Sequence, residues 1–294
     1  MITTFKDWSF AMIARHLCIA AVLFAGISLG DTASAQGGFA PAALATTKVR
    51  DNIYMIRSAA SGNVTVIVGD DGVVLIDAKF ANEHDGAMAQ LKTITNKPVK
   101  YVINTHMHAD HTGGNQALQA LGAQVIASEN ARRIMVETSA PGLPTFAMRD
   151  YLRLYLGKMP IDLYYFGRGH TDGDIVIHLP TERIVVMGDL FAIWGPYMHL
   201  VHYAGGGSIR DWSRSLERAL RLDFDTVIPG HSGLTDRANM EGYLKETVRL
   251  QETVRDMNRA KKSKDDIKKV LGTEFHWSAF MFDLGLDGVI TEMQ

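Results

Sequence analysis

The segment from Val99 to Gly114 constrains the fold of this 294-residue chain more than any other. Its first part, Val99–Asn104, is a β-rich run that predicts a strand, and the segment ends in a glycine-rich turn. Between them lie four side chains that are able to bind a metal: His106, His108, Asp110 and His111. Apolar residues separate most of them, so alternate side chains can point to one side. This spacing is typical of a metal-binding loop.

Three further residues stand at the ends of predicted strands elsewhere in the chain. His170 lies in a glycine-rich loop between two strands, and Asp189 and His231 each follow a buried strand almost directly. Functional loops of an α/β protein gather at such strand ends. A lone loop histidine is more often structural, but together with the first cluster these residues make five histidines and two aspartates. That is the ligand inventory expected for two adjacent Zn²⁺ ions.

Strand and helix patterns alternate along the chain, which predicts an α/β fold with two stacked β-sheets and helices on the outside. The predicted strands are residues 49–57, 63–68, 73–76, 99–104, 124–127, 175–179, 184–187 and 226–228, and the predicted helices are residues 83–96, 116–121, 209–222 and 239–259. The turn Asp70-Asp71-Gly72 predicts a hairpin between two of the strands. No internal repeat or low-complexity linker interrupts residues 36–294, so we expect one domain there.

The motif order resembles the metallo-β-lactamase superfamily over most of the chain, from about Val49 to Leu250. The resemblance implies a four-layer αβ/βα sandwich with a dinuclear site on one edge. It also implies a first metal bound by His106, His108 and His170, and a second bound by Asp110, His111 and His231. Asp189 would bridge the two metals.

The implied chemistry is hydrolysis by a zinc-bound hydroxide. Two neighbouring metals can share a water, lower its pKa toward neutrality and polarise a substrate carbonyl. Asp110 is the predicted catalytic residue, which orients the water and receives its proton. The ligand types suit two Zn²⁺ ions per chain but also accept Fe or Mn. Asp77, at the end of a predicted strand, is expected either to hold the histidine-rich loop through its backbone amides or to be an ordinary turn residue.

The resemblance extends to periplasmic β-lactamases, which makes a β-lactam the first substrate expected. The sequence nevertheless departs from many of those enzymes, which carry cysteine where Asp189 stands, a non-ligand where His111 stands and a drug-binding lysine where Ala192 stands. A lactone, another carboxylic ester or a thioester is therefore the alternative substrate. Two other classes stay open: a non-catalytic metal-binding accessory of a periplasmic oxidation pathway, and an iron-dependent persulfide dioxygenase, whose thiol substrates are cytosolic.

Two segments are candidates for the substrate wall. The loop Ser58–Asn63 is either a groove lining or a plain hairpin connection. The aromatic-rich segment that follows Asp189 is either a substrate wall or a packing element; its members are Trp194, Tyr197, His199, His202 and Tyr203.

The N-terminus predicts export. A basic start is followed by the apolar run Leu17–Leu29 and by Ala33-Ser34-Ala35, so we expect residues 1–35 to be a signal peptide cut before Gln36. The apolar run is short for a membrane span, so a periplasmic or secreted protein without a stable membrane anchor is expected. The only cysteine, Cys18, would be removed with the signal. With 30 basic and 32 acidic residues and no long basic run, the chain predicts a small-molecule substrate and no nucleic acid partner.

Overall fold

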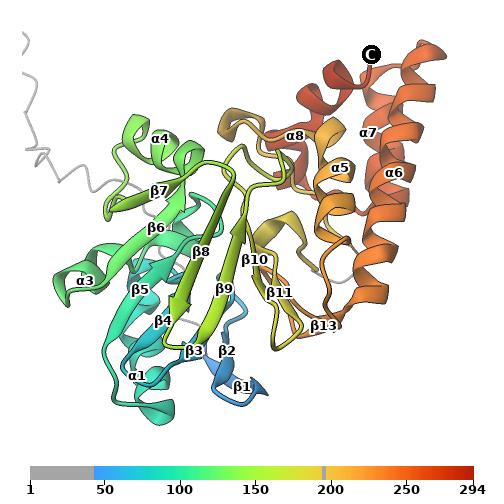
Figure 1. The fold of residues 1–294 in the computed structure, drawn as a ribbon. Helices are drawn as coiled ribbons and strands as arrows, with labels where there is room; N and C mark the ends of the chain where they lie inside the picture. Colours follow the sequence, from blue (N-terminus) through green and yellow to red (C-terminus); the bar gives the residue numbers. More distant parts are fainter. Residues whose placement is uncertain (1–42, 194–196) are drawn as a thin grey trace, which may run out of the picture. The chain divides into compact units, whose positions relative to one another are not determined.

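The computed structural model describes residues 43–193 and 197–294, and these residues belong to one compact unit. The predicted signal peptide and Trp194 lie outside the described residues. Two β-sheets form the centre of the unit (Figure 1). The first has strands in the order β1 to β7: β1 Ala45–Arg50, β2 Ile53–Arg57, β3 Val64–Val68, β4 Val73–Ile76, β5 Val99–Ile103, β6 Gln124–Ser128 and β7 Phe146–Met148.

The second sheet has the order β13-β12-β11-β10-β9-β8. Its strands are β8 Tyr151–Leu156, β9 Met159–Tyr164, β10 Val176–Leu179, β11 Ile184–Val186, β12 Thr226–Ile228 and β13 Thr235–Asp236. Side chains from facing strands of both sheets form one buried apolar cluster, to which β4 contributes Val74 and Ile76. The alternate residues of β4, Val73 and Leu75, face the opposite side, as the two-residue period of a strand requires.

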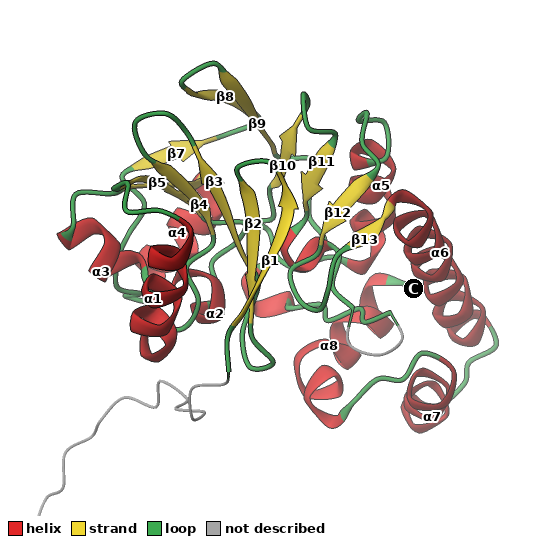
Figure 2. Cartoon of the chain, turned by 90° about the horizontal axis from the view of Figure 1, so that it is seen from below, coloured by secondary structure: helices red, strands yellow, loops and turns green. Residues whose placement is uncertain are grey.

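Helices cover the two outer faces. Figure 2 shows α1 to α4 beside the first sheet and α5 to α8 beside the second. The helices are α1 His84–Ile94, α2 Ala109–Thr112, α3 Asn115–Ala120, α4 Glu129–Glu137, α5 Ile209–Ala219, α6 Arg237–Arg259, α7 Lys264–Glu274 and α8 Ala279–Glu292. The predicted four-layer αβ/βα sandwich is therefore confirmed. Within the described residues, no helix is long and apolar enough to cross a membrane.

The predicted elements differ from the observed ones in a few places. Residues 49–57 are not one strand, because the chain turns at Asn52, whose positive φ of 64° ends β1 and starts β2. The predicted elements do not include the helices α2, α4, α7 and α8, the strands β7 and β13, or the hairpin β8–β9. The hairpin pairs Tyr151–Leu156 with Met159–Tyr164, and α7 and α8 pack against α6 and against each other.

Parallel strand pairs bring the functional loops together. In the first sheet β4 and β5 are parallel with Ile76 opposite Ile103, so the residues after both strands emerge side by side. In the second sheet β11 and β12 are parallel with Val186 opposite Ile228, which brings the loops that carry Asp189 and His231 to the same edge. Loops at the carboxyl ends of parallel strands are the usual position of an active site in α/β folds.

Candidate metal centre

All seven predicted ligands lie together at one edge of the sandwich. They form three overlapping groups whose ligand atoms lie within 4.8 Å of one another: His106, His108 and His170; His106, His111 and Asp189; Asp110, His111 and His231. Two of these groups have the membership expected for the first and second metals. His106 and His108 lie between β5 and α2, Asp110 and His111 lie on α2, and the other three residues come from loops of the second sheet.

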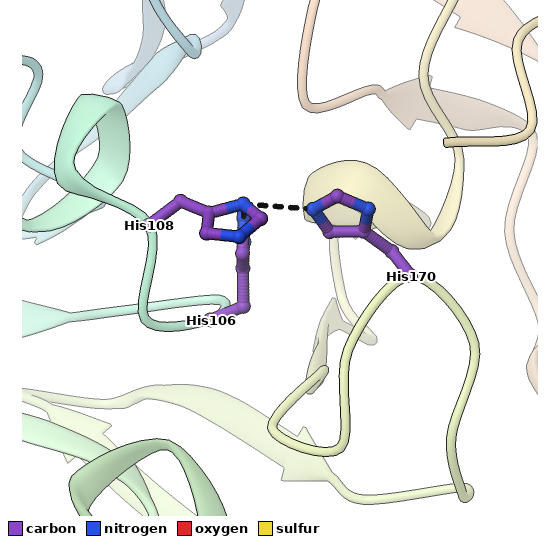
Figure 3. Close-up of side chains that lie close together, drawn as sticks. All are labelled: His106, His108 and His170. Atoms are coloured by element: carbon purple, nitrogen blue, oxygen red, sulfur yellow. Dashed lines mark hydrogen bonds between the residues drawn. The ribbon is translucent and has the colours of Figure 1, made fainter. Parts of the chain in front are cut away.

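The first group consists of three imidazoles that face one another (Figure 3). The Nδ1 atom of His108 lies 3.0 Å from Nε2 of His106 and 2.9 Å from Nε2 of His170. His106 and His170 are fully buried. Three ring nitrogens therefore point at one spot from two different layers of the fold.

The second group is built around Asp110. Its Oδ2 atom lies 3.3 Å from Nε2 of His111 and 3.3 Å from Nε2 of His231. Asp189 stands between the two groups, with Oδ2 3.4 Å from Nε2 of His231 and 3.7 Å from Nε2 of His170, and with Oδ1 3.4 Å from Nε2 of His111. Its carboxylate thus faces both groups, which is the position predicted for a bridge.

The spacing of these atoms fits metal ions. Zinc bonds of about 2.0–2.1 Å in a tetrahedron place neighbouring ligand atoms about 3.3–3.4 Å apart. The distances around Asp110 and Asp189 are of that size. In addition, the buried His111 Nε2 and Asp189 Oδ1 have no hydrogen-bond partner among the described residues. Since buried polar atoms are normally paired, this pair of atoms fits a bound cation.

In four of the imidazoles, the ring nitrogen that faces away from the ligand cluster also has a polar partner. Nδ1 of His170 donates to the carbonyl of Leu200 at 2.5 Å, and Nδ1 of His106 lies 3.1 Å from the Thr105 hydroxyl. Nε2 of His108 lies 2.8 Å from Nδ1 of His202. The fourth, His111, is bound by Asp77. Such bonds fix the ring orientation and leave the other nitrogen for the metal.

Asp77 holds the histidine-rich loop, which is the first of the two roles expected for it. Its Oδ1 accepts the backbone amide of Thr105 at 2.7 Å, and its Oδ2 accepts the Thr105 hydroxyl at 2.8 Å and Nδ1 of His111 at 2.7 Å. This contact follows from the parallel pairing of β4 and β5, because Asp77 and Thr105 come just after those strands.

Two glycines and a buried lysine that the sequence analysis did not single out also shape the centre. A Cβ on Gly62 would lie 2.3 Å from the His111 ring, and one on Gly230 would lie 2.0 Å from Oδ1 of Asp189. Gly62 donates its amide to Asp110 at 3.2 Å and accepts from Nζ of Lys79 at 2.6 Å. A lone lysine within the apolar run 73–81 was the signal that could have revealed Lys79, which is fully buried.

Charges within the centre differ between the two groups. Burial lowers the pKa of His106 and His108 well below the ordinary value, with help from neighbouring imidazoles. Burial opposes the charged forms of His111 and His231 too, but Asp110 raises the pKa of His111 well above its ordinary value, and Asp189 raises that of His231 to about 9. His106 and His108 are therefore neutral ligands, whereas His111 and His231 would release protons as a metal binds.

A cavity of about 830 Å³ opens onto the centre. The predicted loop Ser58–Asn63 takes part in it through Ala59 and Ala60, and the aromatic-rich segment takes part through His202. Other members of that segment pack instead. His199 is buried, 2.8 Å from the Thr247 hydroxyl, and the hydroxyls of Tyr197 and Tyr203 donate to the Asn239 carbonyl and to the Glu292 carboxylate respectively.

Comparison with known proteins agrees with this geometry. The family model of the metallo-beta-lactamase superfamily matches residues 57–231. A metallo-beta-lactamase type 2 from Bacillus cereus is 27% identical over 191 residues, which are 63% of this chain and 72% of that protein. The 2,4-dinitroanisole O-demethylase subunit alpha from Nocardioides sp. (strain JS1661) is 28% identical over 205 residues, 67% of this chain and 60% of that one.

The fold is shared with solved structures. A metallo-beta-lactamase from Pontibacter korlensis superposes with a TM-score of 0.63 at 23% identity and covers 69% of this chain and 99% of its own. The segment that the family model matches ends at His231, so α6, α7 and α8 lie beyond it.

Proposed function

The chain belongs to the metallo-beta-lactamase superfamily, and on that premise we propose that it is an exported metal-dependent hydrolase that opens a carboxylic amide or ester bond. The observation that supports this most is the convergence of five imidazoles and two carboxylates at the base of an open cavity. Two divalent ions, with zinc as the first candidate, would be held by His106, His108 and His170 on one side and by Asp110, His111 and His231 on the other. Asp189 would contact both.

Bound metal ions would supply an acidified water as nucleophile and a Lewis acid for the substrate carbonyl. The protein's own contribution is to hold the reacting groups. The Asp110 side chain is 18% exposed, and it lines the cavity. The amide of Gly62 donates to its Oδ2, and the Nε2 atoms of His111 and His231 lie 3.3 Å from that oxygen. The carboxylate is thereby placed to orient a water that enters from the cavity and to accept its proton.

Two substrate classes are candidates. β-Lactam hydrolysis is supported by the similarity to proteins named metallo-beta-lactamase type 2. Hydrolysis of a lactone or another carboxylic ester is supported by the cavity, because no lysine or arginine occurs among its described lining residues. A β-lactam drug bears a carboxylate, which would bind best beside a lysine or arginine in the cavity wall.

Metal analysis followed by paired assays tests this proposal. Protein purified with excess zinc should hold two equivalents, and His231→Ala should lower that number toward one while the first group stays loaded. The loaded protein should turn over a chromogenic cephalosporin or a simple γ-lactone, and Asp110→Asn should cost at least about 100-fold, the lower range for a group that transfers a proton.

Three outcomes would contradict parts of this proposal. One equivalent of zinc in the unmodified protein would contradict the dinuclear site. Full loading without turnover of either substrate would contradict the hydrolase and favour a metal-binding accessory. Iron in place of zinc after purification from untreated cells would favour oxygenase chemistry.

A further inference from the structure

The polar part of the cavity lining is confined to the metal centre. Five of the twelve described lining residues are polar, and each is a candidate ligand or contacts one: His108, Asp110, Asp189, His202 and His231. The other seven are apolar: Ala59, Ala60, Phe80, Ala109, Leu200, Phe280 and Leu284. A substrate in this cavity would therefore meet charge at its reacting end and hydrocarbon at its other end.

These seven apolar residues form an apolar wall of the cavity, and its most prominent part belongs to α8. Phe280 and Leu284 are four residues apart, so they lie on one face of the helix. Phe280 is 59% exposed, and it lines the cavity together with Leu284. The neighbouring face of the same helix, with Met281 and Val289, is buried in the core.

The wall is fixed in place next to the centre. Near the end of α8, Glu292 accepts the hydroxyl of Tyr203 at 2.8 Å, and the Ile290 carbonyl accepts the side-chain amide of Asn258 at 2.8 Å. Tyr203 directly follows His202, whose imidazole contacts His108. The helix that lines the cavity is thus anchored to the loop that supports a candidate ligand.

We propose that α8, which lies beyond the segment that the family model matches, is a specificity element that selects uncharged substrates with an apolar substituent, with Phe280 and Leu284 as its contacts. This inference rests on the proposed hydrolase function and narrows it to neutral lactones or esters that carry an alkyl or aryl group. The cavity of about 830 Å³ is large enough for such a substituent beside the reacting carbonyl. A carboxylate at the far end of the substrate would lose its water shell against hydrocarbon with no cation to replace it.

A series of γ-lactones tests the wall. Unsubstituted γ-butyrolactone is compared with γ-lactones that carry ethyl, butyl and hexyl chains, and with one whose hexyl-length chain ends in a carboxylate. Each buried methylene should raise kcat/KM by about fourfold until the wall is filled, as expected for transfer of a CH₂ group from water. The terminal carboxylate should lower kcat/KM by at least about 10-fold relative to the hexyl lactone.

Variants assign the effect to α8. Phe280→Ala and Leu284→Ala should each reduce the preference for the hexyl over the unsubstituted lactone by about 10-fold. Leu284→Lys should move the preference toward the lactone that bears the carboxylate. Phe146→Ala is the matched control, because Phe146 is similarly exposed at 52% but lies on β7 and does not line the cavity. It should keep the chain-length dependence of the unmodified protein.

A binding measurement separates this inference from the proposed function. The five-membered lactam with the same hexyl chain is stable to hydrolysis, so its binding to zinc-loaded protein can be measured by calorimetry. Chain-dependent lactam binding without lactone turnover would contradict the hydrolase but support the wall. Lactone turnover that does not depend on chain length would contradict the role of α8 but not the hydrolase function. The same holds if Phe280→Ala and the unmodified protein show an equal preference for the hexyl over the unsubstituted lactone.

Discussion

Replacement of Asp77 by asparagine should weaken the second metal group while leaving the first nearly unchanged. Asp77 has a positive φ of 65°, which asparagine tolerates better than most residues, so the backbone can stay in place. The amide oxygen can still accept the Thr105 amide, which lies 2.7 Å away. Its NH₂ group would then face Nδ1 of His111, where the carboxylate now accepts a hydrogen bond at 2.7 Å.

That exchange reverses the polarity of the contact. To accept from the asparagine NH₂, His111 has to place its proton on Nε2, which is the nitrogen that faces Asp110 and Asp189. A protonated Nε2 cannot bind a metal. A lost hydrogen bond to a charged group costs about 1.5–3 kcal/mol, and this corresponds to a fall of about 10- to 100-fold in the affinity for the second zinc.

Stepwise zinc titration against a chelator measures the two affinities separately. The affinity for the first equivalent of zinc should change by less than about threefold, because His106, His108 and His170 form no hydrogen bond with Asp77. Asp71→Asn is the control: Asp71 is an exposed aspartate that pairs with Lys100 in the turn before β4. Unchanged affinity for the second zinc in Asp77→Asn would refute the proposed role of the tautomer.

Three further predictions follow from the site and the N-terminus. Asp189→Cys should lower turnover by at least about 10-fold at matched metal content, and Asp189→Ala should lower it further. Asp223→Asn, at an exposed surface ion pair, should change turnover little. Equal activity in Asp189→Ala and the unmodified protein would remove Asp189 from the site. Burial lowers the pKa of Lys79 from 10.5 to about 8, so between these values the unfolded chain binds more protons and this lysine's contribution to stability rises with pH. The free energy of unfolding of the metal-free protein, compared with that of Lys79→Met in urea at pH 7 and pH 10.5, should shift by about 3 kcal/mol in favour of lysine at the higher pH; a constant difference would contradict this. N-terminal sequencing of exported protein should begin at or near Gln36, and material that still begins at Met1 would disprove the cleavage.

The cluster of candidate metal ligands was predictable because part of it carries a local signal. His106, His108, Asp110 and His111 occur within six residues, and few structural reasons account for that density of ligands. His170, Asp189 and His231 have no such signal of their own. They became interpretable only because each stands beside a predicted strand, at the edge where an α/β sheet collects its loops. Apolar periodicity similarly revealed most strands and the helices α5 and α6.

The hydrogen bonds behind the ligands and the walls of the cavity could not be predicted in the same way. Lys79 lies 17 residues from Gly62, and His202 lies 94 residues from His108, yet each pair is in hydrogen-bond contact. Nothing in the local pattern near Phe280 and Leu284 distinguishes a helix that packs in the core from one that lines a cavity.

The sequence by itself therefore determined the class of fold and which residues form the candidate site, because ligand spacing and hydrophobic period are local properties of the chain. Only the tertiary structure decided which protein groups orient each imidazole, that Asp189 faces both ligand groups, and that α8 lines the cavity. These relations join residues from both sheets and from helices far apart along the chain. Their geometry depends on how the layers pack, and packing is the sum of many weak contacts that no single segment encodes.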